Sequence, residues 1–254
     1  MAREDALTGK VAVITGGNSG IGLAAAREFK KNGAKLVIFG RSRKSLDQAA
    51  ASLGGGVETV EGDVRNLGDL ERLFKLTGDK LGKIDVLVAN AGIAKFSPID
   101  AFPEALFDEL CDTLFKGVFF TVQKALPHLR DGASVILVST SEAPKEARIG
   151  NSVYLAAKAA VRAVAKSMSM EFLQRRIRVN AISPGMTETP IIYRSGELPG
   201  GLTPEQVATA VTGFIPLHRR AKPEEMARAI LFLASDDSSY CLGSELLVDG
   251  GLQL

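Results

Sequence analysis

Tryptophan is absent from this sequence of 254 residues, and there are only two histidines and two cysteines. Cys111 and Cys241 lack the spacing of metal ligands, and His128 and His218 belong to no cluster of His, Cys and Asp residues. A metal-dependent mechanism is therefore not favoured. Both cysteines lie in apolar stretches, which predicts that they are small core residues.

Long apolar runs are also absent. No run approaches the ~18 residues of a membrane-spanning helix, and the first residues, Met1–Asp5, lack the apolar stretch of a secretory signal. The 31 basic and 29 acidic residues leave a net charge of only +2, which gives no reason to expect a nucleic-acid or membrane partner. We therefore expect a soluble cytoplasmic protein.

Strand-like and helix-like segments alternate along the chain. The expected strands are Lys10–Thr15, Lys35–Phe39, Val57–Glu61, Ile84–Ala89, Ser134–Ser139, Arg178–Ile182 and Glu245–Val248. The expected helices are Ile21–Asn32, Lys44–Leu53, Leu67–Leu81, a long helix from Pro103 toward Pro127, Ser152–Leu173, Glu205–Val211 and Pro223–Ala234.

Connections of helix length between strands predict parallel pairing with right-handed crossovers. The strands are continuously apolar, as expected when helices cover both faces of a sheet. We therefore predict an α/β fold with a doubly wound, seven-stranded parallel sheet, formed by residues 1–254 as a single domain. The segment 189–217 interrupts the alternation with glycines and prolines, and we expect it to be a substrate lid.

A glycine-rich turn, Thr15–Gly22, joins the first strand to the first helix. Glycines allow a tight turn and a close approach of the backbone to a pyrophosphate, whose charge the helix N-terminus favours. The spacing is G-x-x-x-G-x-G rather than the G-x-G-x-x-G fingerprint. The candidate cofactor contacts in this turn are Gly16, Asn18, Ser19, Gly20, Ile21 and Gly22.

No acidic residue follows the second strand, where an NAD enzyme would hold the ribose 2′-OH. Gly40, Arg41, Ser42 and Arg43 stand there instead. Arg41, with Ser42 beside it, can stack on adenine or pair with a 2′-phosphate. NADP(H) is therefore favoured over NAD(H), which is still possible. Arg43 and Lys44 could instead be solvated residues at the start of a helix that do not contact a cofactor. We adopt that interpretation for Lys44.

Further candidates follow the next two strands. Asp63 and Val64 come after the third strand, and Asp63 could accept the adenine amino group or instead cap the helix that starts at Leu67. Asn90, Ala91 and Gly92 follow the fourth strand, where the backbone could pass close to the adenine ribose. Ligands of open α/β sheets bind at such carboxyl ends of strands.

Tyr154 and Lys158 are four residues apart in an expected helix, so they share one face. The usual pKa of a phenol, about 10, is too high for a base near neutral pH, but a neighbouring cation favours the phenolate. A tyrosine of this kind could exchange a proton with an alcohol or carbonyl oxygen. The alternative is a half-buried tyrosine beside an exposed lysine.

Taken together, these stretches resemble the short-chain dehydrogenase/reductase family in its single-domain form, over nearly the whole chain. The matching stretches are Thr15–Gly22, Asn90–Gly92, the Tyr154 and Lys158 pair, Asn180–Gly185 and Leu246–Gly251. The resemblance implies a Rossmann-like fold and hydride transfer between NADP(H) and a ketone or secondary alcohol. It also implies a homotetramer, with the long fourth helix and the Tyr154 helix at one interface.

The resemblance further implies the roles of individual residues. Ser141 lies thirteen positions before Tyr154, as the family's catalytic serine does, and would stabilise the substrate oxygen. Tyr154 would donate the proton in reduction, and Lys158 would lower the pKa of Tyr154 and hold the nicotinamide ribose. The implied contacts around the nicotinamide are Pro184, Gly185, Thr187 and Thr189.

One position departs from the family pattern, because Leu114 stands where an asparagine is expected. In the family, that asparagine supports a water that links the lysine to solvent, and a leucine side chain cannot hold this water. A distortion of the helix near Gly117 could free a backbone carbonyl for it instead. The departure keeps open a degenerate nucleotide-binding protein with a regulatory or scaffolding role. A reductase of carrier-bound acyl chains is another alternative, with Arg219, Arg220 and Lys222 as its docking patch.

We expect the substrate pocket to be framed by Ala94, Phe96, Glu142, Ala143 and the segment 189–217.

Overall fold

The computed structural model describes residues 5–141, 149–191, 193 and 203–254. Within them, seven strands form one parallel sheet in the order β3-β2-β1-β4-β5-β6-β7. The strands are β1 (Val11–Thr15), β2 (Lys35–Gly40), β3 (Val57–Glu61), β4 (Ile84–Ala89), β5 (Leu129–Val138), β6 (Arg178–Pro184) and β7 (Glu245–Val248). The predicted doubly wound parallel sheet is confirmed.

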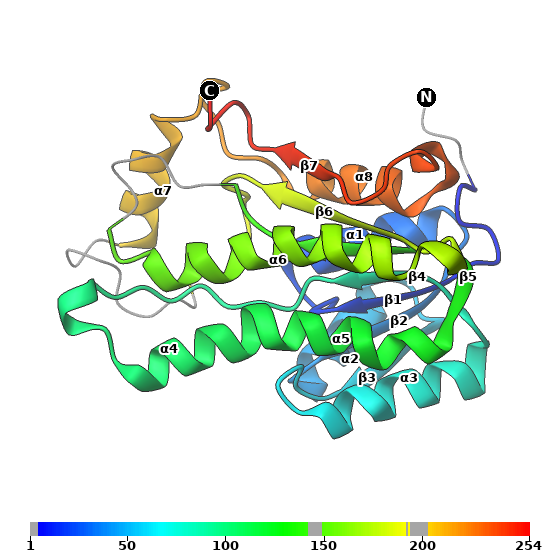
Figure 1. Cartoon of the computed structure of the whole chain (residues 1–254). Helices are drawn as coiled ribbons and strands as arrows, with labels where there is room; N and C mark the ends of the chain where they lie inside the picture. Colours follow the sequence, from blue (N-terminus) through cyan, green and yellow to red (C-terminus); the bar gives the residue numbers. More distant parts are fainter. Residues whose placement is uncertain (1–4, 142–148, 192, 194–202) are drawn as a thin grey trace.

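Eight α-helices accompany these strands in the described chain (Figure 1). They are α1 (Gly20–Lys31), α2 (Arg43–Ser52), α3 (Leu67–Leu81), α4 (Glu104–Cys111), α5 (Gly117–Ala125), α6 (Ser152–Glu171), α7 (Pro204–Thr212) and α8 (Pro223–Ala234). Short 3₁₀ helices cover Ile99–Ala101, Leu126–His128, Leu173–Arg175 and Asp236–Ser238. No helix of the described residues is long and apolar enough to span a membrane.

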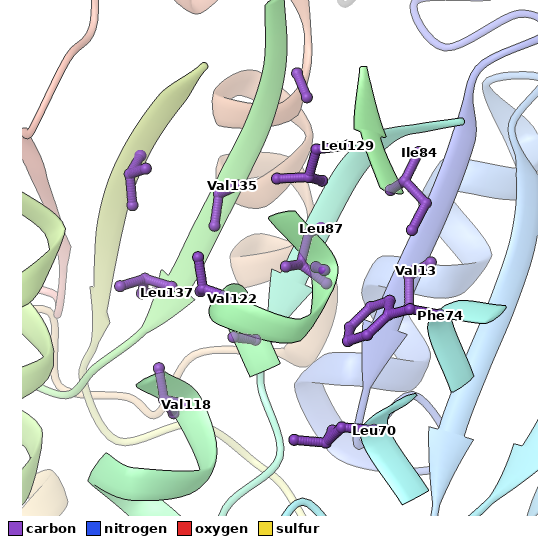
Figure 2. Packing of buried hydrophobic residues seen from close by; sticks show 14 of the residues in the cluster. Val13, Leu70, Phe74, Ile84, Leu87, Val118, Val122, Leu129, Val135 and Leu137 are labelled. Atoms are coloured by element: carbon purple, nitrogen blue, oxygen red, sulfur yellow. The ribbon is translucent and has the colours of Figure 1, made fainter. Parts of the chain in front are cut away.

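Alternate side chains of each strand enter different cores. Val13 of β1 packs on the face covered by α3, α5 and α6, whereas its neighbours Ala12 and Ile14 pack on the face covered by α1, α2 and α8. Figure 2 shows the first core, where Phe74 of α3 and Val122 of α5 lie over the strands. Each fully buried side chain of this size contributes about 1.5–3 kcal/mol through its removal from water.

The strand order reverses between β1 and β4. After β3 the chain crosses back over β2 and β1, and β4 pairs on the far side of β1. The loops that leave β1 and β4 therefore diverge to opposite faces of the sheet and leave a crevice at the carboxyl ends. The glycine-rich turn and Asn90 follow these two strands.

The long helix expected from Pro103 toward Pro127 is not continuous. A π-helical segment, Asp112–Lys116, separates α4 from α5, and the Gly117 N–H bonds to the Asp112 carbonyl five residues earlier. Pro103 occupies the N-cap position of α4, not its first turn. A Cβ at Gly117 would lie 2.9 Å from Val64 Cγ2, so this distorted turn packs closely only with glycine.

Other boundaries shift by a few residues. β5 begins at Leu129, five residues before the expected Ser134, and β6 extends to Pro184. Both cysteines are partly exposed, not core residues as predicted. Glu142 and Ala143, which we expected at the substrate pocket, lie outside the described residues, as do residues 192 and 194–202 of the expected lid.

Candidate active site

The turn between β1 and α1 requires glycine at three positions. Gly16 and Gly20 have positive φ angles of 67° and 53°, which side chains rarely adopt. A Cβ on Gly22 would collide with the Gly16 carbonyl and the Asn90 amide. Ser19 is the N-cap of α1 and forms no side-chain capping bond within the described chain. The first N–H groups of α1 are therefore suited to an anion.

Asn90 holds this turn together. Its amide nitrogen donates to the carbonyls of Thr15 and Gly16 at 3.0 and 3.2 Å. In addition, the backbone N–H groups of Asn90 and Ala91 both donate to Thr15 Oγ1 at 3.1 Å. The Asn90 side chain thus fixes the ends of β1 and β4 relative to each other and braces the turn.

Asn18 lies over Gly40 at the end of β2. A Cβ on Gly40 would be 2.5 Å from Asn18 Oδ1, and Asn18 Nδ2 donates to Ser45 Oγ at 2.7 Å. Ser42 caps α2 by accepting the Ser45 N–H. Glycine at position 40 therefore lets the glycine-rich turn contact the start of α2.

Arg41 and Asp63 lie near each other at the carboxyl ends of β2 and β3. Burial alone would raise the pKa of Asp63, but hydrogen bonds and charge from Arg65, with the charge of Arg41, outweigh it and lower this pKa. Arg65 Nη2 is 2.6 Å from Asp63 Oδ2. Asn66, not Asp63, caps the helix that starts at Leu67, so our capping alternative for Asp63 is wrong.

Two neighbouring residues have other contacts. The Arg43 side chain donates to Thr59 Oγ1 at 2.9 Å and lies 3.5 Å from Glu61, so it is engaged along the edge strand β3. Val64 is buried and packs against Gly117.

Lys158 is buried in α6, which excludes the alternative of an exposed lysine. Its ammonium donates to the Val138 carbonyl at 2.7 Å, and Ser139 Oγ donates to the Lys158 carbonyl at 2.8 Å. A Cβ on Gly92 would lie 3.8 Å from Lys158 Nζ and 3.3 Å from Leu114 Cδ2, so Leu114 and Lys158 both border Gly92. Burial lowers the pKa of Lys158 from 10.5 to about 8.

Tyr154 lies one turn before Lys158. Burial raises the pKa of its phenol, and a hydrogen bond with the Thr140 side chain opposes that rise. The net direction of this pKa is thus opposite to the predicted lowering, because burial has the largest effect on the phenol. The Phe96 ring meets the Tyr154 ring edge-on, with centroids 6.0 Å apart.

Ser141 is buried just beyond β5. Its N–H donates to the Pro184 carbonyl at 2.8 Å, and the Gly185 N–H donates to Val248 O at 2.9 Å. The ends of β5, β6 and β7 are thus linked in a row. A Cβ on Gly185 would lie 2.6 Å from the backbone of Asp249, so this close approach requires glycine.

Thr187 and Thr189 follow β6. Thr187 Oγ1 donates to the Gly185 carbonyl at 3.0 Å. A Cβ on Gly20 would lie 3.2 Å from Thr189 Cγ2, which places Thr189 against the start of α1. The predicted residues of the glycine-rich turn and of the segment after β6 therefore meet.

Leu114 lies in a small apolar cluster. It is fully buried with Leu110 and Ala157, and Val153 and Tyr154 pack against this cluster. Ala94, which we expected at the substrate pocket, is almost fully buried.

Two residues near Tyr154 escaped the sequence analysis. Thr140 opposes the rise in the pKa of Tyr154, although the spacing from Tyr154 favoured Ser141. Arg162 Nη1 donates to the Thr140 carbonyl at 3.0 Å. Arg162 lies one turn after Lys158 on the same helix, and this spacing could have identified it from the sequence.

Known proteins resemble this chain over nearly its whole length. A family model described as enoyl-(acyl carrier protein) reductase matches residues 16–253. The chain is 40% identical to the oxidoreductase asL5 of Sarocladium schorii over 254 residues, which cover 99% of both proteins.

Two solved structures are also similar. The short-chain dehydrogenase/reductase, glucose/ribitol dehydrogenase, from Brucella melitensis superposes with a TM-score of 0.90 at 31% identity, covering 99% of this chain and 100% of that one. The L-sorbose reductase of Gluconobacter frateurii, complexed with NADPH and L-sorbose, gives a TM-score of 0.89 at 31% identity over 98% of each chain.

Proposed function

This chain belongs to the short-chain dehydrogenase/reductase family of oxidoreductases, and we propose that it transfers hydride between NADP(H) and a small ketone or secondary alcohol. The observation that carries this proposal is the buried Lys158 ammonium, one helical turn from Tyr154 and beside Gly92. A buried cation is costly without a role or a partner. Its place at the strand ends, near the glycine-rich turn, supports a catalytic role.

The residues around the crevice fit a dinucleotide. Gly16, Gly20 and Gly22 provide a backbone that no Cβ fills, and the start of α1 would hold the pyrophosphate together with Asn18, Ser19 and Ile21. Arg41, beside Ser42, would hold the 2′-phosphate, and the similar sorbose reductase is complexed with NADPH.

The remaining cofactor contacts come from three loops. Asp63 and Val64 would lie at the adenine, and Asn90, Ala91 and Gly92 at the adenine ribose. The segment Pro184, Gly185, Thr187 and Thr189 would hold the nicotinamide, because Thr189 already lies against the start of α1.

The chain's own groups would handle the proton. When bound, NADPH supplies the hydride for the carbonyl carbon. Ser141 would hydrogen-bond the carbonyl oxygen as its negative charge develops. Tyr154 would donate its phenolic proton to that oxygen, and the Lys158 cation would favour the phenolate left behind.

The test is turnover. NADPH oxidation should be measured against a panel of ketones, first with wild type and then with Tyr154→Phe. The variant loses only the hydroxyl, so it should still bind NADPH while kcat falls far more than tenfold. Tyr240→Phe, at a fully exposed position, is the matched control and should keep wild-type turnover. If Tyr154→Phe kept more than a tenth of kcat, a loss under about 1.4 kcal/mol, Tyr154 would not be the acid.

A reductase of carrier-bound acyl chains is a second candidate, because the description of the matching family model points to it. Its expected basic patch is largely neutralised. Arg219 forms two bonds with Glu225 at 2.7 and 2.8 Å, and Arg220 lies 3.7 Å from Glu188. We therefore favour a free small-molecule substrate. Including a 3-oxoacyl thioester and a 2-enoyl thioester in the panel decides between the two, since the second candidate requires one of them to outperform every free ketone.

The degenerate nucleotide-binding alternative gains no support from the comparisons, which point to oxidoreductases.

We also propose a homotetramer. Phe107 of α4, Phe119 of α5 and Met170 of α6 are exposed, and these apolar side chains lie on the helices that the family resemblance puts at an interface. Light scattering should give four times the chain mass of 26.9 kDa; a monomer mass would exclude the proposal.

A further inference from the structure

Thr113 has a buried hydroxyl without a hydrogen-bonding partner. The residue lies in the π-helical segment Asp112–Lys116 and is only 6% exposed. Among the buried side-chain nitrogen and oxygen atoms of the described residues, Thr113 Oγ1 is the only one that forms no hydrogen bond. Buried polar groups are almost always paired, because an unpaired one loses its bonds to water without compensation. This exception therefore requires an explanation.

Other buried threonines in helices bond to their own helix. Thr77 Oγ1 donates to the Leu73 carbonyl at 2.8 Å, and Thr121 Oγ1 donates to the Gly117 carbonyl at 2.6 Å. Each of these carbonyls lies four residues before the threonine, which is a usual acceptor for a helical hydroxyl. Thr113 forms no such bond in the described structure. Its hydroxyl is therefore available to another group.

The direction of the helical crossover places Thr113 beyond the ends of the strands. The chain from α4 through α5 connects the parallel strands β4 and β5, so it runs opposite to both (Figure 1). Gly117 packs against Val64, which lies just past the carboxyl end of β3. Thr113 lies about one turn, or about 6 Å, before Gly117. The Thr113 side chain is therefore on the crevice side of the strand ends.

Two loops flank Thr113 at this level. Its chain neighbour Leu114 lies against Gly92 of the loop after β4, since a Cβ on Gly92 would be 3.3 Å from Leu114 Cδ2. Gly117, one turn on, lies against Val64 of the loop after β3, where a Cβ would be 2.9 Å from Val64 Cγ2. Thr113 thus lies between the two loops that, under the proposed function, contact the adenosine half of the dinucleotide.

The reacting end of the site lies on the helix face that carries Leu114. Leu114 belongs to the buried apolar cluster against which Tyr154 packs, and Lys158 also borders Gly92. Successive residues of a helix point in directions about 100° apart. Thr113 therefore does not share the face of Leu114, and it is placed toward the adenosine end of the crevice instead.

We infer that the Thr113 hydroxyl forms a hydrogen bond with the adenosine half of the dinucleotide, at a ribose hydroxyl or a ring nitrogen. A threonine hydroxyl donates one bond and accepts two, so it suits either group. The identity of the ligand rests on the proposed function, whereas the unpaired hydroxyl does not. In the free protein the hydroxyl lowers stability, and in the complex it strengthens binding. A variant without it separates these effects, because they have opposite signs.

The variant is Thr113→Val, which keeps the shape of the side chain and removes the hydroxyl. Calorimetric titration of the full protein with NADPH, NADH and 2′,5′-ADP measures affinity without turnover. We expect all three dissociation constants to rise by the same factor, about three- to tenfold, as the loss of one neutral hydrogen bond predicts. Reduced nicotinamide mononucleotide, the other half of the cofactor, should bind with unchanged affinity.

Thermal unfolding without cofactor is the second measurement. Thr113→Val should raise the unfolding temperature by about 2–4 °C, because a methyl group replaces a buried, unpaired hydroxyl. Thr121→Val is the matched control, since it removes a buried hydroxyl of the same crossover that does have a partner. This control should lower the unfolding temperature and leave every affinity unchanged. Thr113→Ser keeps the hydroxyl and should bind each ligand as wild type does.

An unchanged affinity for 2′,5′-ADP in Thr113→Val, or an equal loss in Thr113→Ser, would overturn the inference. A lower unfolding temperature in Thr113→Val would also overturn it, since the hydroxyl would then have a partner in the free protein. If Thr113→Val does not fold, the affinities of Thr113→Cys decide, because a thiol is a weak donor of similar size.

Turnover separates this inference from the proposed function. Weaker binding of 2′,5′-ADP to Thr113→Val, with no turnover of any ketone by wild type, rejects the proposed reaction and retains the role of Thr113. Turnover by wild type with unchanged affinity in Thr113→Val does the reverse.

Discussion

Lys158 should make the stability of this protein depend on pH in an unusual direction. Burial lowers its pKa from 10.5 to about 8, so between these values the unfolded chain binds a proton that the folded protein does not. Stability therefore rises with pH across this window. At about 1.4 kcal/mol for each pH unit, the full cost of the buried ammonium below pH 8 is about 3 kcal/mol.

The perturbation is Lys158→Met, which keeps an unbranched apolar side chain and removes the charge. The free energy of unfolding should be measured by urea denaturation at pH 7 and pH 10, at one protein concentration. Wild type should gain about 2–3 kcal/mol relative to the variant between the two pH values. Lys166→Met, at an exposed position of the same helix, should show no such difference. If wild type gained no stability relative to Lys158→Met between pH 7 and pH 10, the ammonium would not be buried as described.

Two further predictions concern Leu114 and Arg41. Leu114→Asn replaces a fully buried apolar side chain with an amide, so it should lower the free energy of unfolding by about 2–4 kcal/mol. We expect kcat to change less than tenfold. An inactive wild type whose turnover this variant restores would instead identify a degenerate binder. Arg41→Ala should weaken NADPH binding by about tenfold, because a hydrogen bond to a charged group at an exposed site contributes at the lower end of its usual range. The affinity for NADH should not change. Arg43→Ala is the control and should leave both affinities unchanged. Calorimetric titration measures both affinities, and equal wild-type affinities for NADPH and NADH would reject the NADP(H) assignment. Gly40→Asp is unsuitable for this test, because its Cβ would meet Asn18.

The parallel sheet could be predicted because its signals are local. Each strand is a short apolar run, and each connection is long enough for a helix, so pairing direction follows from connection length. The glycine turn was also predictable, since glycines between a strand and a helix have a specific backbone purpose. The positive φ at Gly16 and Gly20 agrees with that interpretation.

The contacts around Tyr154 could not be predicted, because they join residues far apart in the sequence. Spacing from Tyr154 selects Ser141 and passes over Thr140, although it is Thr140 that opposes the rise in the pKa of Tyr154. The effect of burial was missed for the same reason. A four-residue spacing places Lys158 near Tyr154, but desolvation depends on everything that covers them.

The π-helical segment bears on the one departure from the family pattern. A side chain at position 114 was expected to serve a water near Lys158, and a leucine cannot. The segment Asp112–Lys116 changes the backbone bonding from four residues to five at this point, and such bulges are frequent at functional sites because they redirect backbone carbonyls. A backbone carbonyl can hold a water whatever the side chain of its residue. The segment can therefore provide the water site that the asparagine would have supported, while Leu114 packs against Tyr154. This makes loss of the asparagine compatible with turnover.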